Sequence, residues 1–195
     1  MVFQERTYSV LLVSSSEKFN ASIQPLLPPT DYWPVQTVLS VAEAQRKLLE
    51  SAWDLVIINA PLPDDFGMRL AVSTCGNSGA GVLLLVRSEL YNDIYSKVVS
   101  SGVLVLPKPT TLQIVAQNLR VLCATRERLR QMEEKQVSVE KKIEEIRLVN
   151  RAKWLLIECL SMTEAGAQHY IERQAMDMRI SKREVAEDII KTYKN

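Results

Sequence analysis

Short apolar runs, separated by longer amphipathic segments, form the pattern of roughly the first 120 residues. Because these runs have almost no polar alternation, each predicts a strand buried on both faces, as in a parallel sheet covered by helices. The runs are Tyr8–Val13, Val35–Val38, Asp54–Asn59, Val82–Val86 and Val103–Leu106. Between them, Val41–Ser51 and Glu89–Ser100 carry apolar residues at helical spacing. The pattern predicts an α/β, flavodoxin-like (βα)5 domain over residues 1–119.

The segment 120–146 repeats its apolar residues in alternating steps of three and four, with charged residues between them. This spacing predicts a coiled-coil linker helix that pairs two copies into a homodimer. No glycine or proline interrupts residues 110–165, so the helix is expected to run into the tail. The predicted dimer seam consists of Leu122, Leu129, Met132, Val139, Ile143 and Ile146. A single solvated connector helix is the alternative.

The tail, residues 147–195, predicts a small three-helix bundle. Ser161 and Glu164 are spaced as a capping box, and so are Ser181 and Glu184, which predicts two helix starts about 20 residues apart. The expected buried stripe of the middle helix is Ala167, Ile171, Ala175 and Met178. A bundle of this size is a plausible binding module and a poor enzyme.

The composition argues against several classes of function. The formal net charge is +1, with three separated cysteines and one histidine, so neither a disulfide framework nor a zinc cluster is expected. No signal peptide or membrane-length apolar run is evident, which favours a cytoplasmic protein without membrane contact. The chain also lacks a glycine-rich phosphate loop and a nucleophile elbow. We therefore expect no enzyme, no cofactor and no metal.

The run from Asp54 to Gly67, with the later pair Lys108-Pro109, resembles a response-regulator receiver domain over about residues 7–120. In that family two acidic residues bind Mg²⁺, an aspartate accepts the phosphoryl group, and a threonine or serine and a lysine complete the site. The corresponding residues here are Ser14, Ser15, Asn59, Arg87 and Lys108. We expect Lys108 to bond Asn59 or the backbone in a turn that holds the fold, and a retained switch contact is the alternative. The resemblance therefore implies a pseudo-receiver without a phosphoacceptor, kept as a surface for a partner such as a sensor protein. Asp64 and Asp65 are alternative metal ligands, although loop carboxylates are usually solvated.

The tail carries three residue pairs, Ala152-Lys153, Ala175-Met176 and Val185-Ala186. With them it resembles the ANTAR domain, a family named for the AmiR and NasR antitermination regulators. The similarity covers residues 143–192 and rests on the order and spacing of these pairs. Trp154 departs from it, since the family usually has glycine there. The resemblance implies binding to stem-loops in nascent leader RNA, which prevents termination. Charged and planar side chains suited to RNA are Arg151, Lys153, His169, Tyr170, Arg179, Lys182 and Arg183.

Two other functions remain open from the residues alone. A DNA-binding response regulator would present a basic recognition helix, whereas Glu184–Ile190 is acidic. A scaffold whose tail binds only protein is the third reading.

Overall fold

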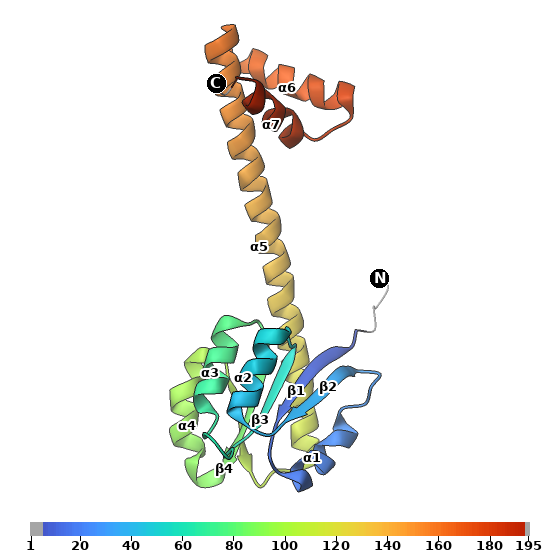
Figure 1. The fold of residues 1–195 in the computed structure, drawn as a ribbon, viewed down its shortest axis with the longest axis vertical. Coiled ribbons are helices and arrows are strands. Elements are labelled where there is room, and N and C mark those ends of the chain that lie inside the picture. Colours follow the sequence, from blue (N-terminus) through green and yellow to red (C-terminus); the bar gives the residue numbers. More distant parts are fainter. Residues whose placement is uncertain (1–5, 194–195) are drawn as a thin grey trace. The chain divides into compact units, whose positions relative to one another are not determined.

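The computed structural model describes residues 6–193, which form two compact units that divide between Gln131 and Met132. The N-terminal unit is an α/β domain, and the C-terminal unit is helical (Figure 1). One helix, α5 (Leu112–Leu160), begins in the first unit and ends in the second.

The N-terminal unit contains a five-stranded parallel sheet in the order β2-β1-β3-β4-β5. Its strands are β1 (Tyr8–Val13), β2 (Tyr32–Val38), β3 (Leu55–Asn59), β4 (Gly81–Arg87) and β5 (Leu104–Lys108). Its other helices are α1 (Glu17–Ile23), α2 (Val41–Glu50), α3 (Met68–Asn77) and α4 (Tyr91–Val98). Short 3-10 turns follow at Gln24–Leu26, Ser88–Leu90 and Val99–Ser101. The predicted flavodoxin-like fold is confirmed.

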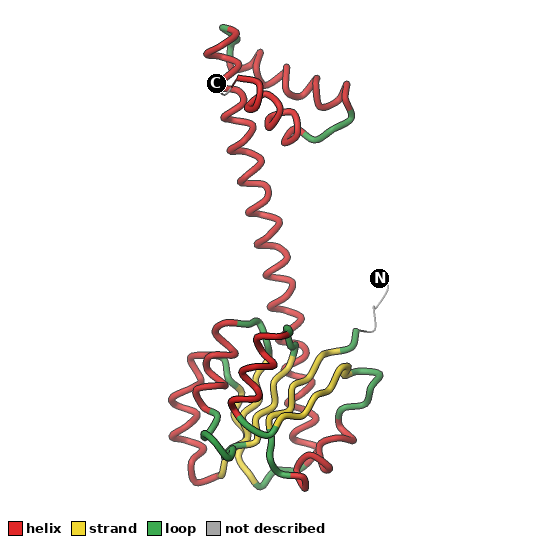
Figure 2. The backbone as a smooth tube through the Cα atoms, in the orientation of Figure 1, coloured by secondary structure: helices red, strands yellow, loops and turns green. Residues whose placement is uncertain are grey.

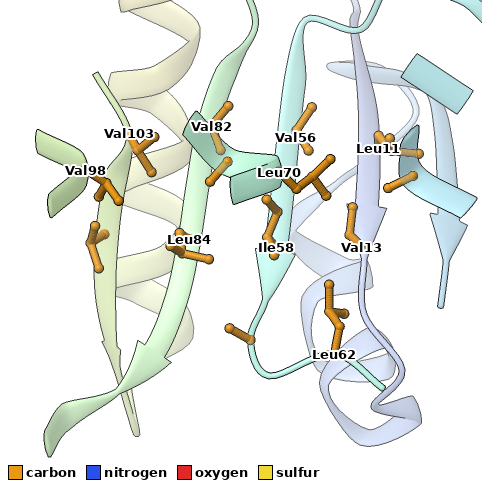
Figure 3. Packing of buried hydrophobic residues seen from close by; sticks show 14 of the residues in the cluster. Leu11, Val13, Val56, Ile58, Leu62, Leu70, Val82, Leu84, Val98 and Val103 are labelled. Carbon is orange, nitrogen blue, oxygen red and sulfur yellow. The ribbon is translucent and has the colours of Figure 1, made fainter. Parts of the chain in front are cut away.

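Successive side chains of the central strands point to opposite faces of the sheet, and both faces are buried. Figure 3 shows one face, where side chains of β1, β3 and β4 gather around Leu70 of α3. Helices α2, α3 and α4 cover this face with Ala44, Leu70 and Ile94. On the other face α1 and α5 pack against the sheet. This double covering explains why the strands read as continuous apolar runs.

The first turns of α5 belong to the core of the N-terminal unit. Val115, Leu119 and Leu122 are all almost fully buried against the sheet. A Cβ added to Gly81 would lie 3.2 Å from a Leu122 methyl carbon, which is a tight contact, so Leu122 packs closely over the start of β4. Leu122 therefore cannot take part in the dimer seam expected for it, because its side chain is already covered by its own domain.

The C-terminal unit packs two short helices, α6 (Glu164–Met178) and α7 (Lys182–Tyr193), with the last turns of α5 (Figure 2). Its core consists of Ala152, Leu156, Ala167, Ile171, Ala175, Val185, Ala186 and Ile189. Half of these residues are alanines, whose small side chains occupy little space between the helices. Met178, expected in this core, is the last residue of α6 and is 58% exposed.

Only one of the two expected capping boxes forms. The Ser181 hydroxyl accepts from the Glu184 amide at 3.2 Å, and the Glu184 carboxylate accepts from the Ser181 amide at 2.8 Å. The prediction of a capping box at Ser161 is wrong. The chain passes Ser161 in the left-handed region at φ 52°, and Thr163 caps α6 by accepting from the Gly166 amide at 3.1 Å.

Ser181→Ala is expected to destabilise α7 by about 1 kcal/mol, because it leaves a helix N-terminal amide without its acceptor. Native-state hydrogen exchange of the α7 amides in the full chain measures this loss, and Ser181→Thr is the matched control. The stability of α7 should also depend on pH, because the Ser181 amide and hydroxyl lower the pKa of Glu184. That stabilisation is present above the unfolded glutamate pKa and is lost as the pH falls through the folded one. Unchanged exchange in Ser181→Ala would mean that the box does not hold α7.

Among residues 6–193, no helix combines the length and apolar character that crossing a membrane requires.

Candidate functional site

Three of the predicted pocket residues meet at the carboxyl edge of the sheet. Asn59 ends β3, and its amide nitrogen donates to the Ser14 hydroxyl at 3.1 Å. The Lys108 ammonium donates to the Asn59 carboxamide oxygen at 2.7 Å and also to the Ala60 carbonyl. Ser14 and Asn59 are buried. The result is a closed polar network in which the lysine is held by neutral oxygens.

The remaining two pocket residues lie at the same edge without entering this network. Arg87 ends β4 directly beside Lys108 in the sheet register, and its side chain is exposed. Burial lowers the pKa of Lys108, and the neighbouring Arg87 charge lowers it further. Ser88 donates its hydroxyl to the Lys108 carbonyl at 2.8 Å, whereas Ser15 is exposed. This edge of the sheet therefore carries two cationic side chains together with hydroxyl and carboxamide groups.

The two loop aspartates considered as metal ligands serve backbone amides. The Asp64 carboxylate accepts from the Val41 and Ala42 amides, both at 2.9 Å, and so caps the start of α2. These bonds lower the pKa of Asp64. Asp65 accepts from the Gly67 amide at 2.7 Å. In the described part of the chain, no group of three or more histidine, cysteine or acidic side chains is placed to hold a metal ion.

Sequence reasoning missed the role of Asp64, which ties the loop after β3 to a helix more than 20 residues earlier. A carboxylate that meets two amides at a helix N-terminus is a favourable arrangement. Ser40 and Glu43, which also cap α2, were the local signal for a helix start. No local pattern could have supplied the partner from the loop.

The basic residues singled out for RNA differ in how accessible they are. Arg151 and Arg179 are exposed, and Arg179 ends α6 in the left-handed conformation at φ 55°. Lys153 is sheltered, with 15% of its side chain exposed, and it lies 3.3 Å from Glu164. Lys182 pairs with Glu172 at 2.7 Å, and Arg183 pairs with Glu187 at 2.9 Å.

The planar side chains of the C-terminal unit are also on its surface. His169 is exposed, and the nearby Glu172 has its pKa lowered mainly by its hydrogen bond with Lys182. Tyr170 is 37% exposed, and Trp154 is 70% exposed, so its ring does not pack into the bundle. Trp154, at the position where the family resemblance leads us to expect glycine, therefore lies on the surface of α5 and outside the core.

Five of the six predicted seam residues expose their side chains. Leu129, Met132, Val139, Ile143 and Ile146 are between 40% and 59% exposed in the single chain. Exposed apolar residues at this spacing are what an unpartnered coiled-coil face presents.

Known proteins resemble both units of the chain. Residues 138–190 match the model of the ANTAR domain. The chain is 26% identical over 140 residues to the transcriptional regulatory protein PdtaR of Mycobacterium tuberculosis, covering 71% of this chain and 68% of that protein.

Solved structures of receiver domains share the fold of the N-terminal unit. The signal receiver domain of an HD domain-containing protein from Pseudomonas fluorescens has a TM-score of 0.58 and 25% identity, covering 67% of this chain and 96% of that chain. A CheY-like receiver domain protein from Methanospirillum hungatei has a TM-score of 0.54 and 16% identity, covering 63% of this chain and 98% of that chain. The chain therefore matches the ANTAR domain over residues 138–190, and its N-terminal unit has the fold of receiver domains.

Proposed function

We propose that this chain, which joins a receiver-like domain to an ANTAR domain, regulates transcription antitermination by binding stem-loops in nascent leader RNA. The observation that carries the proposal is the match of residues 138–190 to the ANTAR domain. The similarity to a transcriptional regulatory protein agrees with a regulatory role for the whole chain.

The surface chemistry of the C-terminal unit supports RNA as the ligand. RNA loops are recognised by phosphate contacts and by stacking of splayed bases on aromatic or guanidinium planes. Arg151 and Arg179 offer exposed guanidinium groups, and His169 and Tyr170 offer rings. Lys153, Lys182 and Arg183 would have to exchange a carboxylate partner for a phosphate, so we assign them a weaker contribution.

We further propose that the receiver-like domain cannot be phosphorylated and instead docks a partner such as a sensor protein. Asn59 stands where a receiver has its aspartate, and a carboxamide is not a competent nucleophile for phosphoryl transfer. Ser14 and Ser15 supply hydroxyls where carboxylates would hold Mg²⁺. The Lys108 ammonium donates instead to the neutral oxygens of Asn59 and Ala60.

We assign the proposed functions to three successive segments of the chain. Residues 1–119 form the pseudo-receiver, residues 120–146 the linker that pairs two copies, and residues 147–195 the RNA-binding module. The packing of Leu122 on the sheet argues that the free part of the linker starts a few residues later than 120.

Incubation with acetyl phosphate and Mg²⁺ is expected to leave the mass of the chain unchanged. The reason is the missing carboxylate set at Ser14, Ser15 and Asn59. Intact-mass spectrometry reads the result, with a receiver that has the full acidic set in the same tube as the positive control. A stable gain of one phosphoryl group within the N-terminal unit would overturn the pseudo-receiver assignment.

The full chain is expected to bind hairpin RNA in preference to duplex DNA of the same length. Filter binding or fluorescence anisotropy at fixed salt provides the comparison, because nucleic-acid affinities depend steeply on salt. Equal or stronger binding to duplex DNA would favour the DNA-binding response regulator. Binding to neither would favour a scaffold that recognises only protein.

A further inference from the structure

A cleft of about 610 Å³ lies at the amino edge of the sheet, opposite the edge that carries Asn59 and Lys108. Its walls come from the starts of β1 and β2 and from α5, and they include Arg6, Tyr8, Asp31, Tyr32, Arg120 and Cys123. Pockets that bind small molecules have volumes of about 300 to 1,000 Å³. None of the five predicted pocket residues lines this cleft, so it is a separate feature of the N-terminal unit.

Two tyrosines form the inner wall of the cleft. Tyr32 is 7% exposed and Tyr8 is half-buried, and their ring centroids lie 6.5 Å apart with the ring planes tilted by 44°. The Cys123 thiol of α5 donates to the Tyr32 hydroxyl at 3.9 Å. The pKa of each tyrosine is raised, mainly because its hydroxyl is buried. The inner wall therefore presents neutral hydroxyl groups and aromatic ring surface.

Two guanidinium groups flank this wall. Arg6 precedes β1, Arg120 lies on α5, and both side chains are exposed. The charge of Arg6 acts on the pKa of Tyr8, and the charge of Arg120 acts on the pKa of Tyr32, so each guanidinium lies near a phenol group. Within residues 6–193, neither arginine has a carboxylate at ion-pair distance. Both cations are therefore available to a ligand.

The carboxylates around the cleft leave it with a surplus of positive charge. Asp31, in the turn before β2, is the acidic residue of the lining and is exposed. The charges of Glu127 and Asp54 also reach the cleft walls. Both of these carboxylates already have arginine partners, Arg130 at 2.9 Å from Glu127 and Arg126 at 3.6 Å from Asp54. The lining itself carries two positive charges and one negative charge.

We propose that this cleft binds a small molecule that carries an oxyanion, a carboxylate or a phosphate, on a flat apolar body. The oxyanion accepts hydrogen bonds from Arg6 and Arg120, whose planar guanidinium groups match such anions in geometry and charge. The flat body lies against the rings of Tyr8 and Tyr32. This site goes beyond the proposed binding of RNA and of a sensor protein, because it takes a small ligand on the receiver-like domain itself.

The position of the cleft connects the ligand with the long helix. Arg120 and Cys123 belong to the early turns of α5, whereas Arg6 and the two tyrosines lie at the starts of strands. A ligand held by both arginines would therefore link α5 to the sheet and stabilise their packing. Because α5 continues into the C-terminal unit, the site would give the chain an input that needs no phosphoryl transfer.

Benzoate and phenyl phosphate are suitable probes, and benzamide is a neutral control of nearly the same shape as benzoate. At constant ionic strength, each anion is expected to raise the Tm of the full chain in a saturable manner, because a ligand that binds only the folded state stabilises it. Benzamide should leave the Tm unchanged. The anion with the larger effect shows whether the site prefers a carboxylate or a phosphate.

Alkylation of Cys123 tests whether the probe occupies the cleft. Cys123 lines the cleft, and the exposed Cys159 of the C-terminal unit is an internal control in the same chain. Burial raises the pKa of Cys123, so labelling with iodoacetamide is done at alkaline pH, where more of the thiolate is present. Peptide mass spectrometry should show several-fold slower labelling of Cys123 when the probe is bound and an unchanged rate at Cys159.

Two substitutions should change probe binding in opposite directions. Arg120→Gln removes a charged hydrogen-bond donor and is expected to weaken binding of the preferred anion about tenfold. Asp31→Asn removes the negative charge of the lining and should strengthen binding. Arg46→Gln, at an exposed position on α2, is the matched control and should leave the affinity unchanged. Isothermal titration calorimetry of the full chains measures all three.

Three results would overturn the proposal. The first is the absence of saturable binding by either anion. The second is equal affinity of the wild-type chain and Arg120→Gln, which would mean that the anion binds elsewhere. The third is an equal effect of the probe on the labelling of Cys123 and Cys159. None of these measurements contains RNA, so a failure of the chain to bind hairpins would count against the proposed function alone.

Discussion

A chain with aspartate at both Leu129 and Ile143 is expected to be a monomer and to lose any preference for two hairpins in tandem. Both side chains lie on the exposed seam face of α5, at 40% and 45% exposure. If pairing buries them, each new carboxylate would be desolvated without a partner, which costs several kcal/mol. Loss of the linked second site should lower the affinity for tandem hairpins on the order of a hundredfold.

The matched control is Val137→Asp, which places the same charge on the opposite face of the same helix. Val137 is 49% exposed, so the change is comparable in chemistry and accessibility. Light scattering and RNA titration should show a dimer with its tandem preference intact for this control. The double variant should retain weak binding to a single hairpin. A double variant that stays dimeric would assign the dimer contact to another surface, such as the receiver-like domain.

The N-terminal fold could be predicted from sequence because its central strands are buried on both faces. Such strands appear as apolar runs whatever their neighbours are. The edge strand β2 was only half recognised, since its first residues include the exposed Trp33 and Pro34, which carry no apolar pattern. Leu122 shows the limit of periodicity. An apolar stripe on a helix looks the same whether it faces a sheet of its own domain or a second chain, and only the fold shows that Leu122 faces the sheet.

The candidate site could be located from sequence, and the bond of its lysine to Asn59 or to the backbone was expected there. In the structure Lys108 donates to the Asn59 carboxamide oxygen and to the Ala60 carbonyl. Other contacts of the two units could not be predicted. Asp64 caps a helix distant in sequence, and Lys153 is sheltered beside Glu164 from the next helix. Both contacts cross between elements, so no local spacing encodes them. Ser161 and Thr163 both have hydroxyl groups that could cap α6, and the backbone conformation places Thr163 at the cap position.

Removing two exposed guanidinium groups from the C-terminal unit is expected to weaken RNA binding and to flatten its salt dependence. The changes are Arg151→Ala and Arg179→Gly. Glycine suits position 179 because the backbone there is left-handed, so the charge is removed without strain. Each phosphate contact releases counterions when RNA binds. The loss of two contacts should therefore reduce the slope of log affinity against log salt by about 1.5.

The control for this variant is Arg46→Ala, which removes an exposed arginine from α2 of the N-terminal unit and should leave both affinity and slope unchanged. The slope separates a phosphate contact from a fold defect. A destabilised bundle would lose affinity in proportion to the unfolded fraction at every salt concentration and keep its slope. If affinity falls while the slope is unchanged, Arg151 and Arg179 do not contact phosphates. The RNA surface would then have to be built from Lys153, Lys182 and Arg183, each of which would exchange its present carboxylate for the backbone of the transcript.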